Sequence, residues 1–380
     1  NGDRIGTVIV DTYEASPFKN LGMDNPNGSQ RYYIGHVDWT GFNGLVEYTG
    51  SDQFSAVLQF GTSSQTYQWE GFYTAAPSTK SRKITVDGGY IKGGANYRMN
   101  ENSNIFFNVG QIMRPPSFDG VFPNADYDFE EADDITNESF TSFELGYGFI
   151  SSNFKANINA YHTVWGDRTL RRSTSIDDQG VRIIYDGVEQ THQGIEAEMT
   201  WYPSSRLRIR GMASIGDWKY SKNFDGDAYF IDNNQPAGTT GTLYLDGVKI
   251  GDAAQSVLYL GADYKLSSKL SMDLDIMSFD NLHGRFGPLD SEFNSANNRG
   301  SIKLPSWGTV DLGATYRFSL LGYDTTARLN INNLLDEEYL SQSQTNFHND
   351  GGRTWNGVNV ENQVYFGKGT TWNLGLNIRF

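Results

Sequence analysis

The sequence predicts an all-β fold, a transmembrane antiparallel β-barrel of which about 14 strands are present. Three observations predict it. Apolar and polar residues alternate along many short segments, which is typical of strands with one apolar and one wet face. Short polar turns alternate with long polar connections along the chain. Aromatic residues gather at the strand ends that precede the short turns.

Composition agrees with an all-β chain and excludes several classes of protein. The 380 residues include 22 Tyr, 23 Phe, 8 Trp and 42 Gly but only 10 Pro, and the formal net charge is -15. That charge argues against a nucleic-acid partner, which binds a basic face. No apolar run approaches the roughly 18 residues of a membrane-spanning helix. Cysteine is absent, so the chain has no disulfide and no thiolate metal site.

The strands are predicted from a rhythm of roughly 50 residues between short turns, with one longer gap. The turns lie at 49–52, 100–102, 151–153, 203–205, 267–268 and 319–324. The strands before them end at Tyr48, Tyr97, Phe149, Trp201 with Tyr202, Tyr264 and Phe318, and Phe380 continues the series. Counting back from Phe380 places the first strand at 4–12.

Long polar connections are predicted at the opposite strand ends. They cover roughly 13–33, 62–83, 111–138, 166–187, 217–252, 279–305 and 340–370. Short turns at one edge and long loops at the other describe a transmembrane barrel, with an aromatic girdle at the short-turn side. The alternative is a soluble β-sandwich or repeat array. Isolated Arg, Asp and Glu on the wet face of many strands favour a wide, water-filled lumen over that alternative.

The last segment, W-N-L-G-L-N-I-R-F, is a strand that runs down to a terminal aromatic. Its pattern of Asn373, Gly375, Ile378 and Phe380 looks like the signal that the outer-membrane barrel assembly machinery reads. The physical need is closure, because the last strand of a barrel must pair with the first.

Several motifs, in order along nearly the whole chain, resemble those of TonB-dependent receptors. They are M-R-P-P-S-F-D (113–119), I-T-N-E-S-F-T-S-F-E-L-G-Y-G (135–148), H-Q-G-I-E-A-E (192–198), L-N-I-N-N-L-L-D-E-E-Y (329–339) and G-K-G-T-T-W-N-L-G-L-N-I-R-F (367–380). L-D-G-V-K-I-G-D-A-A-Q (245–255) is a less general match, nearer the receptors of one group of Gram-negative bacteria. Each motif is weakly specific, whereas their common order is strongly specific.

The resemblance implies a 22-stranded outer-membrane barrel whose lumen holds an N-terminal plug that meets TonB. Neither the plug nor the first third of the barrel is evident, so 1–380 is expected to be the C-terminal part of the barrel domain. The implied function is energised, plug-gated import of a scarce bulky nutrient, a siderophore–metal chelate or an oligosaccharide. Expected partners are the TonB system, the barrel assembly machinery, lipopolysaccharide, phospholipid and an extracellular small-molecule ligand. The competing hypothesis is a passive porin of about 14 strands.

An enzyme is not expected. The five histidines are scattered, and the sequence lacks a zinc-protease motif, a nucleophile elbow and a P-loop. An outer-membrane enzyme or adhesin therefore has no supporting motif.

The candidate ligand-binding residues are aromatic and polar residues of the long loops. They are Arg114, Phe118, Asp119, Phe122, Tyr127, Phe129, Trp307, Phe347 and Trp355. Aromatic platforms suit planar chelates and sugars alike, and the alternative for each aromatic is the outer girdle. Haem is disfavoured, because the R-x-P loop of haem receptors carries a His and residues 115–137 contain none.

One acidic segment, D-Y-D-F-E-E-A-D-D (126–134), is a weak candidate for a metal site. Asp126, Asp128 and Glu130 alternate and could gather carboxylates around calcium. The alternative is a solvated acidic loop. No cofactor is expected apart from such a calcium ion.

Overall fold

The computed structural model describes residues 33–71, 79–122, 131–132, 135–176, 179–230, 235–237, 241–287 and 290–379. The chain divides into two compact units. Unit 1 comprises Asn1–Gly44, Gln59–Ile91 and Ile112–Glu138, and unit 2 comprises Leu45–Leu58, Lys92–Gln111 and Ser139–Phe380. The predicted first strand at 4–12 lies outside the described residues.

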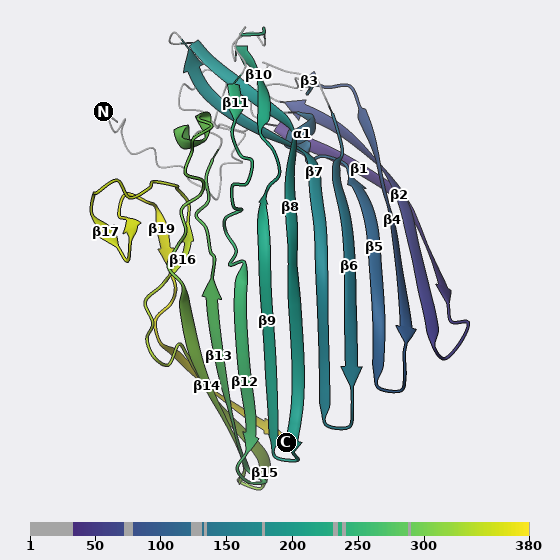
Figure 1. Ribbon diagram of the computed structural model, residues 1–380, viewed down its shortest axis with the longest axis vertical. Coiled ribbons are helices and arrows are strands. Elements are labelled where there is room, and N and C mark those ends of the chain that lie inside the picture. The colour runs from purple at the N-terminus through teal and green to yellow at the C-terminus, as the bar shows by residue number, and fades with distance from the viewer. Residues whose placement is uncertain are drawn as a thin grey trace. The chain divides into compact units, whose positions relative to one another are not determined.

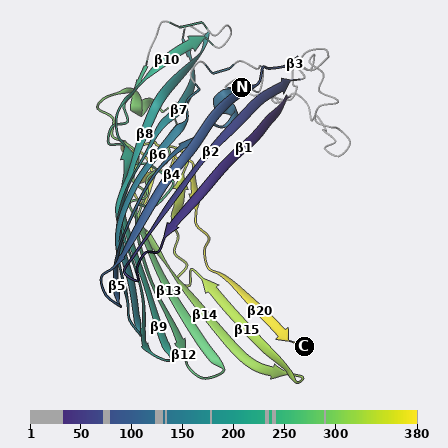
Figure 2. The ribbon, with the colours of Figure 1, turned by 90° about the vertical axis from the view of Figure 1, so that its right-hand side faces the viewer.

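Nearly all of the regular secondary structure consists of strands of one large antiparallel sheet, which confirms the all-β prediction. Its main path runs β1 (Tyr33–Tyr48), β2 (Phe54–Gly71), β4 (Ile84–Arg98), β5 (Ser103–Arg114), β6 (Glu138–Ile150), β7 (Phe154–Ile176), β8 (Gln179–Ser204), β9 (Leu207–Tyr220), β12 (Ser256–Lys265), β13 (Leu270–Asp280), β14 (Trp307–Leu320), β15 (Tyr323–Asn332) and β20 (Thr371–Arg379). The strands from β6 to β15 lie side by side in this order (Figure 1), and β20 follows β15 (Figure 2).

Short strands and two helical turns lie at the long-loop end of the sheet. β3 (Thr79–Lys80) pairs with β2, β10 (Phe224–Phe230) pairs with β8, and β11 (Gly241–Leu243) pairs with β10. β16 (Leu340–Ser343) pairs with β19 (Val364–Phe366), and β17 (Thr354–Trp355) pairs with β18 (Val358–Asn359). The helical turns are α1 (Phe118–Val121) and η1 (Ser291–Asn294). None of the described helices is long and apolar enough to cross a membrane.

The short turns lie where the sequence predicts them, but two predicted loops are wrong in part because strands continue into them. Residues 166–187 were expected to be a long connection, whereas β7 continues to Ile176 and β8 begins at Gln179. Likewise β2 continues to Gly71, well into the predicted loop at 62–83. The physical reason is that strand pairing satisfies the backbone whatever the side chains are. In the extension of β8, one face packs on apolar residues of the outer loops instead of on lipid.

The cross-strand register separates an apolar face from a polar one. On one face, four successive pairs of β8 and β9 are apolar or small, and the next pair is polar. These pairs are Trp201–Ile209, Met199–Gly211, Ala197–Ala213 and Ile195–Ile215, followed by Gln193–Asp217. Ile195 and Ile215 are 55% and 66% exposed. At about 3.3 Å per residue the apolar stretch is about 20 Å long, close to the roughly 25 Å band that lipid covers on an outer-membrane barrel.

The opposite face of the sheet carries ion pairs between β9, β12, β13 and β15. Arg210 bonds to Asp275 at 2.8 Å, and Arg208 bonds to Asp263 at 2.9 Å. Arg328 pairs with Asp273. Because these groups are partly exposed, each pair contributes only up to about 1 kcal/mol to stability. Their significance is that this face is wet, as the sequence predicts for the lumen side.

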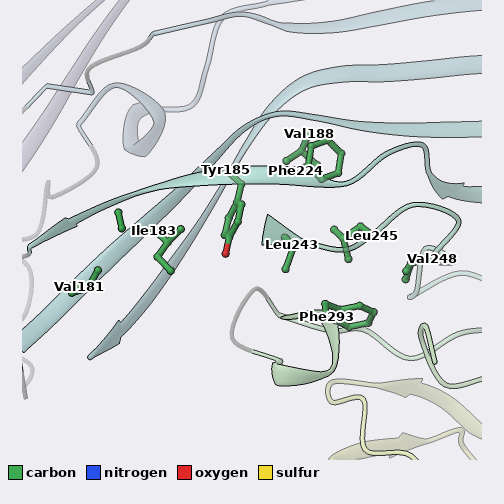
Figure 3. Close-up of a cluster of buried hydrophobic side chains, with 10 residues drawn as sticks. Val181, Ile183, Tyr185, Val188, Phe224, Leu243, Leu245, Val248 and Phe293 are labelled. Atoms are coloured by element: carbon green, nitrogen blue, oxygen red, sulfur yellow. The ribbon is translucent and has the colours of Figure 1, made fainter. Parts of the chain in front are cut away.

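The long connections fold an apolar cluster of their own at the end of β8, drawn in Figure 3. Its members come from β8, β10, β11, η1 and the segment after β11. They are Val181, Ile183, Tyr185, Val188, Phe224, Ala228, Leu243, Leu245, Val248 and Phe293, all less than 9% exposed. This burial stabilises the extension of β8 beyond the apolar band.

Candidate functional site

The polar face near the long-loop end of β7 carries an aromatic and cationic group. Trp165 on β7 stacks on Phe140 of the paired β6, with ring centroids 5.0 Å apart and 24° between the planes. Arg168 lies over the same indole, its guanidinium carbon 3.9 Å from the ring centroid. The Nε of Arg168 is buried and has no hydrogen-bond partner among the described residues.

A local irregularity of β7 places Arg168 there. The register shifts between Trp165 and Arg168, and Asp167 adopts a positive φ of 57°. Such a bulge re-aims side chains, and here it folds the guanidinium back over the preceding indole. A planar cation beside a stacked aromatic pair is suited to a planar or anionic ligand.

A second aromatic group continues the same face across β8 and β9. Trp218 donates its indole Nε1–H to the hydroxyl of Tyr161 at 2.8 Å. The ring of His192 lies 5.6 Å from that of Trp218. Gln255, which is 1% exposed, accepts from the Trp218 backbone N–H at 2.9 Å and donates to its carbonyl at 3.0 Å. These contacts hold the indole in one orientation.

The M-R-P-P-S-F-D motif lies in unit 1 and runs from the end of β5 into the short helix α1. The carbonyl of Pro116 accepts a 2.7 Å hydrogen bond from the hydroxyl of Tyr67. Phe118 stacks on Tyr33, with ring centroids 5.9 Å apart, and contacts Phe122 at 5.0 Å. Phe122 is completely buried, so in this arrangement its ring packs the base of the loop.

The remaining predicted residues of this loop differ in their surroundings. Arg114 pairs with Glu138, and Asp119 is exposed in the first turn of α1. Tyr127 and Phe129 lie outside the described residues, as do Asp126, Asp128 and Glu130. In the described part of the chain, no group of three or more His, Asp or Glu side chains could hold a metal ion.

The aromatic residues predicted near the later loops have separate neighbours. Trp307 stacks on Phe279 at 4.1 Å. Phe347 is 52% exposed, with its backbone N–H bonded to the side chain of Asn362 at 2.8 Å. Trp355 meets Phe366 edge-on at 5.2 Å. The ligand role of all nine residues stays a prediction.

An ionic clasp joins two of these later loops. Arg299 bonds to Glu292 of η1 at 2.8 Å and to Asp350 of the last loop at 2.5 Å. The Arg299 guanidinium lowers the pKa of Glu292 from 4.5 to about 2. The clasp therefore keeps the Glu292 carboxylate charged in ordinary conditions.

The residues predicted for the assembly signal lie on β20, apart from Phe380, which is outside the described residues. Asn373 pairs with Asn330, Gly375 with Arg328, and Ile378 with Thr325, all on β15. The amide of Asn330 donates to the carbonyl oxygen of the Asn373 side chain at 2.8 Å. Their role in assembly stays a prediction.

Sequence reasoning missed Phe140, Trp165 and Arg168. The interpretation of 166–187 as a loop hid Arg168, because a loop residue has no defined face. The sequence did contain a signal. Trp165 is the next member of the odd-numbered series 157–163 that lies on the polar face, and it immediately precedes the Gly-Asp of the bulge.

An antiparallel sheet with an apolar band on one face, short turns at one end and folded loops at the other defines the wall of an outer-membrane transport barrel. The family model described as "TonB dependent receptor-like, beta-barrel" matches residues 5–334. The chain belongs to this family, and its place is the bacterial outer membrane. No curated protein sequence matches the chain.

Solved structures with the same fold are themselves receptors and transporters. The siderophore receptor PiuA from Acinetobacter baumannii has a TM-score of 0.66 at 15% identity, over 91% of this chain and 44% of that one. The ferric-catecholate import receptor Fiu from E. coli K12 gives 0.60 at 11%, over 92% and 45%. The ferric yersiniabactin uptake receptor FyuA from Yersinia pestis gives 0.59 at 12%, over 92% and 47%. The chain thus spans less than half the length of these structures.

Proposed function

We propose that this chain forms the wall and outer loops of a TonB-dependent receptor that imports a scarce, bulky nutrient by energised, plug-gated transport. The ligand class is a siderophore–metal chelate. A plug in the lumen contacts the TonB system, which provides the energy for transport. The described wall and loops contact the ligand. These separate roles of plug and barrel are those expected from the architecture of the family.

The observation that carries the choice of ligand is the group of Phe140, Trp165 and Arg168. Ferric chelates are planar over part of their surface and commonly anionic. A guanidinium is always charged and presents a flat fork of donors, and the buried Nε of Arg168 is unsatisfied. Two stacked rings beside it offer an apolar platform. An anionic chelate satisfies both groups at once.

The names of the structural neighbours support the same ligand class. Those described above are a siderophore receptor, a ferric-catecholate import receptor and a ferric yersiniabactin uptake receptor. They supply a precedent for metal chelates on this fold. The charge and ring chemistry of this chain's own wall supply the specific argument.

The further partners are part of the proposal. The barrel assembly machinery reads the last strand, and lipopolysaccharide and phospholipid cover the apolar band. An extracellular small molecule enters from the long-loop side. Calcium bound by Asp126, Asp128 and Glu130 would stabilise the outer loops.

Two other functions give different results in simple measurements. An oligosaccharide importer uses the same aromatic platforms but gains little from Arg168, because neutral sugars carry no charge. A passive porin conducts ions steadily in planar bilayers, whereas a plugged receptor is nearly silent.

The test is uptake of radiolabelled ferric chelates by iron-limited cells that produce the full-length protein. We expect uptake that stops when TonB is deleted. Arg168→Ala should weaken binding about 10- to 100-fold, because a hydrogen bond to a charged group contributes roughly 1.5–3 kcal/mol. Arg353→Ala, which removes an exposed loop arginine, should bind normally.

Two results would contradict the proposal. Uptake that continues without TonB would contradict energised transport. Equal chelate binding by the Arg168 and Arg353 variants would remove the argument for an anionic ligand. Heat-modifiable migration of each variant shows that the barrel has assembled, so a folding defect is not mistaken for lost binding.

A further inference from the structure

His192 of β8 is a half-buried titratable residue on the polar face of the wall, and the ligand contacts proposed above do not use it. It is opposite Trp218 of β9 in the register. Trp165 of β7 is opposite Gln190, which lies two residues before His192 on the same face of β8. His192 therefore lies one cross-strand row from the indole that carries Arg168.

His192 lies beyond the part of the wall that lipid covers. On β8 the apolar pairs end at Ile195, and Gln193 is the first polar residue after them on that face. His192 is the next residue and lies on the opposite, polar face, about 10 Å past Ile195 at about 3.3 Å per residue. Its imidazole therefore belongs to the aqueous end of the lumen, near the long loops.

The contacts of His192 leave one ring nitrogen available to a ligand. Nε2 lies 3.4 Å from the Oε1 of Gln190, which is 4% exposed. Within the described part of the chain, Nδ1 has no hydrogen-bond partner. A neutral imidazole that donates from Nε2 to Gln190 presents a lone pair at Nδ1, whereas a protonated imidazole presents an N–H there.

The charged group that acts on His192 is positive. Burial lowers the pKa of His192 from its ordinary 6.5, and the Arg168 guanidinium lowers it further. The other titratable groups that face His192 across the strands are Tyr161 of β7 and Tyr220 of β9, which as phenols carry no charge near pH 7. On β8 itself the same face carries Glu196, four residues away, or about 13 Å at about 3.3 Å per residue.

The carboxylates around this part of the wall already have hydrogen-bond or ion-pair partners. The pairs, carboxylate first, are Asp167 with Ser139 (2.5 Å), Asp186 with Thr169 (2.6 Å), Glu189 with Ser221 (2.6 Å) and Asp217 with Lys219 (3.1 Å). Among the described residues no carboxylate bonds to Arg168. A further arginine, Arg285 in the segment after β13, acts on Tyr220 and adds positive charge to the same region.

We propose that His192 is a second, pH-dependent contact for the anionic ligand, and that a ligand bound to Arg168 draws a proton onto His192. This rests on the proposed function, whose ligand site it extends by one row. An anion between the two groups offsets the repulsion from the guanidinium and accepts a hydrogen bond from Nδ1. The bound ligand thereby raises the proton affinity of the imidazole, and the proton raises the affinity for the ligand by the same factor.

Binding should therefore strengthen as the pH falls. In the free protein the pKa of His192 lies below 6.5, and the bound anion raises that pKa. Between the free and bound values, the affinity increases up to about tenfold for each unit by which the pH falls. Above the bound value the imidazole stays neutral, and Arg168 and the stacked rings hold the ligand alone.

The test measures binding of pyrenetetrasulfonate to the purified full-length protein from about pH 8 to about pH 5.5. The sulfonates of this planar aromatic probe do not titrate in that range, so a pH dependence comes from the protein. We expect about tenfold tighter binding at the acid end, with uptake of about one proton for each bound probe. Calorimetry in two buffers of different ionisation enthalpy measures that uptake on the unmodified protein.

Two histidine variants assign the proton. His192→Gln should bind with the weaker affinity of the high-pH state throughout and should take up no proton. His162→Gln is the matched control, because His162 is exposed on the opposite face of β7, with its Nδ1 3.2 Å from the side-chain oxygen of Gln193. This variant should keep the full pH dependence. Heat-modifiable migration shows that each barrel has assembled.

Probe binding without pH dependence in the unmodified protein would overturn the proposal, as would the absence of probe binding at every pH. Full pH dependence and proton uptake in an assembled His192→Gln variant would overturn it as well. Failure of the proposed function gives a different result: cells take up ferric chelates without TonB, while the purified protein still binds the probe in the manner that depends on His192.

Discussion

The phenol ring of Tyr339 stacks on the indole of Trp307, with ring centroids 3.8 Å apart and 17° between the planes. Phe279 stacks on the same indole at 4.1 Å. The carbonyl of Tyr339 also accepts a hydrogen bond from the N–H of Gly367 at 2.9 Å. Tyr339 thereby ties the two ends of the last long loop to the wall formed by β13 and β14.

Gly367→Ala should destabilise this arrangement, because an added Cβ would lie 1.9 Å from the Tyr339 ring. The ring must move off Trp307, and such overpacking costs about 1–3 kcal/mol. Urea unfolding of the purified protein, followed by near-ultraviolet circular dichroism of the stacked rings, measures the change. Gly352→Ala is the control, since nothing lies within 4 Å of its added Cβ. Equal unfolding of both variants would show that the ring moves away without cost.

Asn333→Ala should lower stability by about 2–4 kcal/mol. The Asn333 side chain donates to the carbonyls of Glu337 and Lys368 and accepts from the Glu337 N–H at 2.9 Å. It is 4% exposed and has a φ of 49°. Alanine loses all three bonds and tolerates this backbone poorly.

Asn356→Ala separates the two effects of the Asn333 change. Asn356 has a similar φ of 47° but is exposed, so alanine there adds backbone strain alone. We expect a loss of about 1 kcal/mol in the same urea titration. A loss as large as that of Asn333→Ala would mean that the buried amide contributes nothing.

The clasp at Arg299 should loosen in acid. Arg299 holds the pKa of Glu292 at about 2, below its ordinary 4.5, because a charged carboxylate bonds to the guanidinium. A depressed pKa contributes stability that is complete above pH 4.5 and is lost as the pH falls from 4.5 to about 2. Amide hydrogen exchange of 290–300, corrected for the intrinsic rate, should accelerate across this window.

Glu292→Gln should remove that pH dependence, because the amide does not titrate. Its loop should exchange fast at pH 6 as well as at pH 3. Glu361→Gln changes an exposed loop carboxylate without an ion pair among the described residues, and it should behave as the unmodified protein. An unmodified loop that exchanges equally at pH 6 and pH 2.5 would contradict the clasp.

Replacing Ile378 and Phe380 together by Ser should block assembly in the outer membrane. Ile378 is opposite Thr325 on the apolar face of β20, and each lost side chain removes about 1.5–3 kcal/mol of burial. We expect the larger effect to be failed recognition, with degradation in the periplasm. Asn377→Ser on the polar face is the control. Heat-modifiable barrel in outer-membrane fractions is the readout, and normal assembly of the double variant would refute the assembly signal.

Much of the fold could be predicted because it depends on local pattern. Alternation identified the strands, and the short turns lie at or within a residue or two of the predicted positions. The extensions of β7 and β8 could not be predicted, because the apolar face of the β8 extension packs on a cluster contributed by distant loop segments rather than on lipid. Likewise, Phe118 and Phe122 were recognisable as aromatic loop residues, but their burial differs because one faces Tyr33 and the other closes a core.

The sequence by itself determined the class of protein, because a lipid-facing strand and its short turn leave a signature within ten or so neighbouring residues. Only the tertiary structure decided which distant side chains meet. Trp165 stacks on Phe140 of the neighbouring strand, and Arg168 lies over the same indole because of a bulge. Register and bulges set these contacts, and both depend on backbone pairing, which side-chain identity alone does not encode.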